Sequence, residues 1–287
     1  MIKITHPKLC EICDAYTHYI LSRPRRRLRD NRYAQYLFAP SVLQRVVACP
    51  AEQLPNIILE FQAQFSNIDS SEWLAFKTYM VNQYANVRKE YLPHVLTKLN
   101  LSVCPYCNRH YIFTVDNGRK VSAQFDHFYS KMQYPYLALS FFNLIPCCPT
   151  CNKAKGERQI GLNPYIEGFD NNCTIHIDSP LNCILQKGDW SVQLVGDERS
   201  MANVEAFALD ELYKRHKDYA LDIVFKEIAN EDGYLEVIER EFQRMGLSDN
   251  LTHRILWGCD INSEDMSKRP LSKMTIDLIN QIKSLKG

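Results

Sequence analysis

Residues 147–156 read CCPTCNKAKG, and this stretch decides how the chain is expected to fold. It contains a C-x-x-C pair, Cys148 and Cys151, followed at once by an asparagine and then by two lysines. A second C-x-x-C pair, Cys104 and Cys107 in CPYC, lies upstream. Two such pairs supply the four thiolates that a structural Zn²⁺ takes in tetrahedral geometry. The sequence therefore predicts a four-cysteine zinc clamp.

Four buried thiols or a redox motif are the alternatives to a metal site. A redox C-x-x-C is a single pair at the start of a thioredoxin-like helix, whereas here two proline-containing pairs flank a predicted hairpin. Cys147 could replace Cys148, but only Cys148 keeps the two-residue gap. A third pair, Cys10 and Cys13 in CEIC, has helical spacing and no obvious partner, so we expect it to be buried.

The bulk composition is that of a globular protein. Of 287 residues, 46% are hydrophobic and 23% are charged. The apolar runs are too short to span a bilayer, and the N-terminal stretch lacks the apolar core and cleavage site of a signal peptide. We therefore expect a cytoplasmic protein with no membrane contact. In that compartment eleven cysteines are better explained as metal ligands and buried thiols than as disulfides.

Composition and periodicity divide the chain into three expected parts. Residues 1–100 have helical periodicity interrupted by prolines, and 101–165 are rich in cysteine and aromatic residues. Asn117-Gly118, between two strand-like runs, is typical of a hairpin turn. Residues 166–287 begin with short strand-like runs and then become helical. We expect an α+β protein whose small strand-and-helix core holds the zinc clamp between N- and C-terminal helical arms.

Charge is unevenly distributed, although the net charge is only +1. Residues 1–100 carry thirteen basic against eight acidic side chains, 101–160 carry seven against three, and the remainder carry fourteen against twenty-two. Polyanion binding is therefore expected in the first 160 residues, which include the arginine-rich run RPRRRLRDNR at 23–32. The arginines taken as nucleic-acid-binding candidates are Arg25, Arg26 and Arg27. A solvated helix start is the alternative for that run.

Between and after the cysteine pairs lie residues whose side chains suit proton transfer and the binding of a hard cation. Asp126 precedes His127 in QFDHF, Asn143 follows in FFN, and Asn152 comes directly after the second pair. A histidine with its ordinary pKa of about 6.5 can take a proton from water. The oxygens of Asp126 and Asn152 suit a hard divalent cation such as Mg²⁺ or Mn²⁺. Adjacent residues of a regular strand point to opposite faces, so a bend or the strand end must bring Asp126 and His127 to one site.

Each of these residues also has a plainer interpretation. His127 could be a satisfied core histidine, Asn143 a loop residue, and Asn152 the N-cap of a helix that begins after the cysteine pair. The helix predicted here also carries cations that could meet phosphate. The basic candidates for that contact are Lys153, Lys155 and Arg158.

Taken in order, these residues resemble a known motif. DH at 126–127, N at 143 and CxxCNxxK at 148–155, with CPYCN upstream, are similar to the HNH, or ββα-metal, endonucleases. The similarity covers roughly residues 102–158. The third signature position is asparagine rather than histidine, a variant that recurs within that superfamily.

The resemblance implies a fold and a role for each residue. The fold would be a ββα-metal core with a four-cysteine zinc site. His127 would be the general base, and Asn143 would hold its ring in place. Asp126 and Asn152 would be ligands of a catalytic Mg²⁺ or Mn²⁺, and DNA, or another nucleic acid, would be the substrate.

A more specific resemblance extends over two segments. DHFYSKMQYPYLALSFFNLIPC at 126–147 and LYKRHKD at 212–218 are similar to the nuclease subunits that accompany an ATPase in bacterial anti-phage defence systems of the Septu type. Ser130 stands where a proline would be expected. This resemblance implies an ATPase partner and invading nucleic acid as the target.

Two other functions are compatible with the sequence. One is a zinc-stabilised nucleic-acid-binding or adaptor protein without catalysis, although such a protein would be free to lose the Asp126–His127 and Asn152 set. The other is a restriction or RNase-type nuclease that acts alone, although no specificity region of the helix-turn-helix type is visible.

Overall fold

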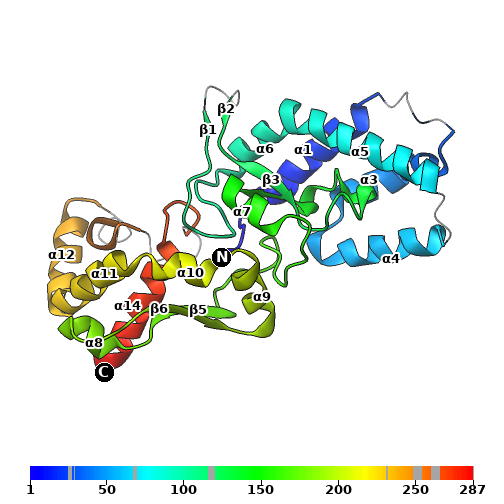
Figure 1. Ribbon diagram of the computed structural model, residues 1–287. Helices are drawn as coiled ribbons and strands as arrows, with labels where there is room; N and C mark the ends of the chain where they lie inside the picture. Colours follow the sequence, from blue (N-terminus) through cyan, green and yellow to red (C-terminus); the bar gives the residue numbers. More distant parts are fainter. Residues whose placement is uncertain are drawn as a thin grey trace. The chain divides into compact units, whose positions relative to one another are not determined.

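Figure 1 shows the computed structural model of the chain. The described residues are 1–24, 28, 30–66, 70–115, 120–230, 232–247, 254–259 and 266–286. The chain forms two compact units. We call Thr5–Leu101 with Ile112–Gln159 the first unit, and Met1–Ile4, Ser102–Tyr111 and Ile160–Gly287 the second. This grouping differs from the three parts expected from composition, because the N-terminal helices and the later strand pair fall in the same unit.

Helices around an aromatic core make up most of the first unit. They are α1 (Leu9–Ser22), α2 (Arg32–Leu37), α3 (Pro40–Ala48), α4 (Leu54–Gln64), α5 (Ser70–Glu90), α6 (Leu92–Leu99) and α7 (Pro149–Lys155). Proline occupies the first turn of α3, α4 and α6, where no backbone N–H is needed. The rings of Tyr33, Phe61 and Phe76 are buried and pack together with those of Phe65 and Trp73. This cluster joins α2, α4 and α5.

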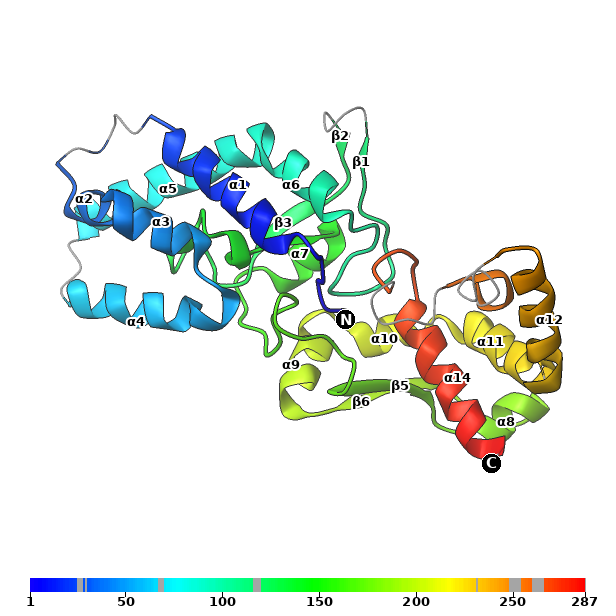
Figure 2. The same cartoon turned by 180° about the vertical axis from the view of Figure 1, so that it is seen from behind.

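Two antiparallel strands and a helix follow one another in the first unit. Strand β3 (Gln124–His127) pairs with β4 (Leu144–Cys147) along its whole length, so that the first residue of one faces the last of the other. All four residues of β4 are buried, which accounts for its uninterrupted apolar sequence. Helix α7 begins two residues after β4 and packs beside β3 in both views (Figures 1 and 2).

Helices α1 and α5 pack against the segment that contains β3 and β4. The Tyr84 hydroxyl of α5 donates to the carbonyl of Phe125 in β3 at 2.8 Å. The Tyr16 hydroxyl of α1 donates to the carbonyl of Leu139 at 3.0 Å. Both tyrosines are buried. These contacts explain why the N-terminal helices and the strand pair form one unit.

A second, very short strand pair precedes β3. Strand β1 (Thr114–Val115) lies antiparallel to β2 (Lys120–Val121). The Asn117-Gly118 turn predicted between them lies outside the described residues.

The second unit is built on a two-stranded sheet and helices. Strand β5 (Cys173–Ile177) pairs antiparallel with β6 (Val192–Gly196). The helices are α8 (Pro180–Leu185), α9 (Glu198–Ala206), α10 (Leu209–Lys214), α11 (Lys217–Ala229), α12 (Asp232–Arg244) and α14 (Ser272–Lys286). Helix α14 lies against β5 and α11 (Figure 2). Buried Asp277 of α14 accepts from the Ile175 backbone N–H at 2.8 Å and pairs with Lys273 at 2.6 Å. No helix in the described part of the chain is long and apolar enough to cross a membrane.

The helical part expected after the strands of residues 166–287 is divided, at its start, into the separate helices α9, α10 and α11. Ala208, between the first two, has a left-handed backbone with φ of 50°. Near the break between α10 and α11, the side chains of Tyr213 and His216 contact the loop of the first cysteine pair. The Tyr213 hydroxyl donates to the Cys107 carbonyl at 2.8 Å. The His216 ring accepts from the Arg109 guanidinium of the same loop at 2.8 Å. These side-chain contacts are made at the end of α10, and the hydrophobic periodicity of the sequence does not predict them.

Candidate active site and metal centre

A pocket of about 260 Å³ lies along β3 in the first unit. Its walls are Tyr84 and Arg88 of α5, residues 124–127 of β3, residues 130–132, Asn152 of α7, and residues 156–157. Asp126 and His127 are adjacent in sequence, yet both line this pocket. His127 is the last residue of β3, and the end of a strand is where two successive side chains can serve one site.

His127 is held in a defined orientation. Its side chain is buried, and Nε2 lies 3.1 Å from the Ala138 carbonyl oxygen. A carbonyl can only accept, so Nε2 carries the proton of the neutral ring and Nδ1 carries the lone pair. The edge of the ring meets Tyr84, with the centroids 4.4 Å apart. Burial, with nearby Lys131, lowers the pKa of His127 to about 3, so the ring is neutral at neutral pH and only weakly basic in the free protein.

Asp126 is buried and pairs with a buried lysine. The Lys155 ammonium lies 3.2 Å from one carboxylate oxygen of Asp126 and 3.3 Å from the other, and it donates to the His127 backbone carbonyl at 2.7 Å. Lys155 is fully buried. The sequence suggested that Lys155 contacts phosphate directly. The structure does not support this contact, because the ammonium is enclosed in protein and already bound to β3. Lys155 fixes two successive residues of the strand against α7.

Replacing Lys155 with methionine should destabilise the protein by about 3–5 kcal/mol, because it leaves the Asp126 carboxylate buried without a counter-charge. Thermal and urea unfolding without added Mg²⁺ would measure this loss. Lys153→Met is the matched control, since Lys153 is exposed on the same helix and its replacement should change stability by about 0.5 kcal/mol or less. Equal stability of Lys155→Met and wild type would contradict the assignment.

Asn143 is fully buried and joins the two ends of the loop that follows β3. Its side-chain oxygen accepts from the Tyr129 N–H at 2.7 Å. Its amide donates to the carbonyls of Tyr129 at 3.1 Å and Leu137 at 3.0 Å. Leu137 precedes Ala138, whose carbonyl receives the His127 ring. Asn143 thus contacts the backbone that orients the ring, and the hydrogen bonds of its side chain go to that loop.

Asn152 faces the pocket from α7. The N-cap of α7 is Cys148, whose sulfur accepts from the Cys151 N–H, so the alternative role of Asn152 as N-cap is excluded. Its amide Nδ2 donates to the side-chain oxygen of Gln124 at 2.5 Å. Because Nδ2 is used in this way, the side-chain oxygen is the atom of Asn152 left to act as a ligand.

The basic candidates occupy different environments. Lys153 and Arg158 are exposed, on α7 and just after it. Arg25, Arg26 and Arg27 lie outside the described residues.

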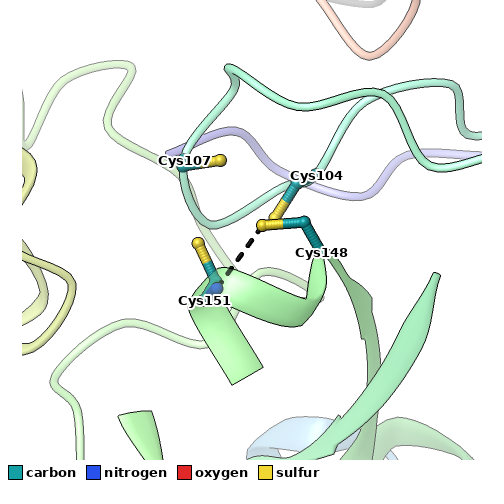
Figure 3. Close-up of side chains that lie close together, drawn as sticks. All are labelled: Cys104, Cys107, Cys148 and Cys151. Carbon is teal, nitrogen blue, oxygen red and sulfur yellow. Dashed lines mark hydrogen bonds between the residues drawn. The ribbon is translucent and has the colours of Figure 1, made fainter. Parts of the chain in front are cut away.

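The four predicted zinc ligands come together. The sulfurs of Cys104, Cys107, Cys148 and Cys151 all lie within 4.8 Å of one another, and all four residues are buried. Figure 3 shows the four side chains converging, two from a loop and two from the start of α7. Four thiolates at this spacing can hold one tetrahedral metal ion, and thiolates favour Zn²⁺.

The other cysteines lie outside this cluster. Cys147 is buried in β4 and belongs to the strand. Burial raises its pKa well above the usual value, which makes it an inert thiol. The third C-x-x-C was expected to be a buried pair. Only Cys13 is buried, whereas Cys10 is exposed.

Some residues of the pocket have no signature in the sequence. Tyr84 and Arg88 come from a helix far upstream of the cysteine pairs, Gln124 lies at the start of β3, and Lys131 lies in the loop after it. Nothing in the spacing of Tyr84 or Arg88 connects them with the motif. Gln124, two residues before Asp126, could have been found from strand alternation, which places residues i and i+2 on one face.

Comparisons with known proteins support one assignment. No curated protein and no solved structure matches the chain. The family model described as HNH endonuclease matches residues 104–158. The match includes both cysteine pairs, β3, β4 and α7, and therefore most of the pocket. Residues 104–158 thus carry an HNH endonuclease domain.

Proposed function

We propose that this protein is a metal-dependent HNH endonuclease that hydrolyses DNA phosphodiester bonds. The observation that carries the proposal is the pocket along β3. Within the matched domain, the pocket combines the neutral ring of His127, the carboxylate of Asp126 and the side-chain amide of Asn152. This combination supplies a proton acceptor and oxygen donors in one small cavity.

His127 is proposed as the general base. With Nε2–H committed to the Ala138 carbonyl, the Nδ1 lone pair is available to take a proton from the attacking water. Burial makes the free ring a weak base. A bound phosphate strengthens it, because a nearby negative charge favours the protonated ring and raises its pKa. Asn143 acts as a positioning residue through the loop that carries Ala138.

The oxygen donors of the pocket fit a hard divalent cation. The Asp126 carboxylate and the Asn152 side-chain oxygen would hold Mg²⁺ or Mn²⁺, as these metals prefer oxygen ligands. Such a cation, when bound, neutralises charge on the phosphate and the leaving oxygen. The four-cysteine cluster is proposed to hold a separate, structural Zn²⁺. The exposed cations Lys153 and Arg158 are proposed to contact the DNA backbone.

We also propose that the enzyme acts in the cytoplasm, in bacterial anti-phage defence, together with an ATPase. This part rests on the two sequence segments at 126–147 and 212–218 that resemble Septu-type nuclease subunits. In the structure, Tyr213 and His216 of the second segment support the loop of the first cysteine pair.

Cleavage of plasmid DNA with and without divalent cations tests the proposal. Purified protein should nick or linearise the plasmid with Mg²⁺ or Mn²⁺ and should be inactive when these are left out. Parallel assays on single-stranded DNA and RNA identify the substrate. Binding of DNA without cleavage under every metal condition, with zinc present, would favour the non-catalytic binding protein instead.

A further inference from the structure

The pocket along β3 contains two cations that the described structure leaves without an acidic partner. Among the residues described, neither Arg88 of α5 nor Lys131 of the loop after β3 forms an ion pair. The third cation near the pocket, Lys155, is instead paired with Asp126. The pocket therefore presents two cations beside His127, while its acidic lining residues are Asp126, which is paired with Lys155, and Glu157.

Lys131 is held in place by an aromatic ring. Its ammonium lies 5.2 Å from the ring centroid of Tyr84 and is half-buried. Tyr84 is in turn fixed by its hydrogen bond to Phe125 in β3 and by its contact with His127. A cation over an aromatic face is oriented as well as stabilised. One tyrosine thus positions both the proposed base and a cation next to it.

Burial of Lys131 is only partly compensated by its surroundings. Desolvation lowers the pKa of its ammonium, and nearby Arg88 lowers it further, whereas Asp126 and Glu157 act in the opposite direction. A bound anion would offset both the desolvation and the repulsion from Arg88. A phosphodiester is an anion of suitable chemistry, since lysine contacts phosphate as a point charge and arginine can do so with two parallel hydrogen bonds.

We propose that Lys131 and Arg88 together bind the phosphate group that faces His127 in the pocket. The inference deepens the proposed nuclease function and rests on it for the identity of the ligand. It also assigns part of the substrate site to α5, a helix outside residues 104–158, so that the HNH segment is completed by the N-terminal helices. Lys155 has the separate task of positioning Asp126.

The test measures binding and cleavage separately. Binding of a short fluorescein-labelled DNA duplex by His127→Ala protein is followed by anisotropy over a range of salt concentrations. Adding Lys131→Gln or Arg88→Gln should weaken binding about tenfold or more, the loss typical of a charged hydrogen bond. Each glutamine substitution should also reduce, by about one, the magnitude of the slope of the log association constant against log salt concentration. Lys131→Arg should restore most of the affinity, since it keeps the charge.

Lys89→Gln is the matched control, because Lys89 is exposed on the same helix and does not line the pocket. Folding of each variant is checked by thermal unfolding. Because Arg88 is exposed, Arg88→Gln should stay folded, so its DNA binding can be measured even if Lys131→Gln is unstable. If wild type cleaves DNA while both glutamine variants behave like Lys89→Gln, the inference is wrong and the nuclease assignment stands. If wild type never cleaves but binding depends on Lys131 and Arg88, the phosphate site stands and the nuclease assignment fails.

Discussion

Replacing His127 with alanine is expected to lower the rate of DNA cleavage by about 10²–10⁴-fold, the usual contribution of a general base. The loss should fall on kcat, because the ring takes a proton only during the reaction. DNA affinity should change little, since the proposed phosphate contacts come from other residues. Initial rates of plasmid cleavage at saturating Mg²⁺, together with anisotropy binding, measure the two effects.

His94→Ala is the control for this experiment. His94 is an exposed histidine of α6 in the same unit, and its replacement should leave cleavage unchanged. Because His127 is buried, the alanine variant must also be shown to retain its thermal unfolding transition. Cleavage by folded His127→Ala at the wild-type rate would show that another group takes the proton.

Replacing Cys151 with serine should abolish binding of the zinc ion proposed for the four-cysteine cluster and disorganise the start of α7. Structural zinc sites contribute an apparent 10–16 kcal/mol in zinc-finger peptides, so loss of one ligand thiolate is a large perturbation. Helix α7 has seven residues and is too short to be stable alone. Zinc content by mass spectrometry should fall from one per chain toward zero. The unfolding temperature and the cleavage rate should fall with it.

Cys147→Ser separates zinc binding from the general effect of losing a thiol. Cys147 is adjacent to the proposed ligand Cys148 and is equally buried, but it lies outside the four-cysteine cluster. This variant should keep one zinc per chain. A full zinc complement in Cys151→Ser, or loss of zinc in Cys147→Ser, would contradict the proposed ligand set.

Much of the candidate site follows from sequence because its chemistry is local. Each C-x-x-C pair is a tight turn, and the sulfurs of the two pairs were expected to meet and do so. The DH pair was expected at a bend or a strand end, and it lies at the end of β3. In these cases the residue type and the short spacing carry the geometry, and little depends on distant parts of the chain.

The parts that sequence could not predict depend on tertiary contacts. Lys155 follows the second cysteine pair at a spacing that suggests a surface cation, but its burial is decided by how α7 lies on β3. Tyr84 and Arg88 enter the pocket only because α5 packs beside the strand pair. The break between α10 and α11 occurs where Tyr213 and His216 contact the loop of the first cysteine pair. Helical periodicity in the sequence does not predict such contacts.

The spacing between Cys151 and Lys155 has a consequence for how this segment can vary. The two residues are four apart on α7 and both are buried, so one helical face carries a sulfur of the four-cysteine cluster and the ammonium bound to Asp126. An inserted or deleted residue between them would turn one relative to the other by about 100°. Substitution of Ala154 should therefore leave the two contacts in register, whereas a change in the number of residues in this turn should separate them.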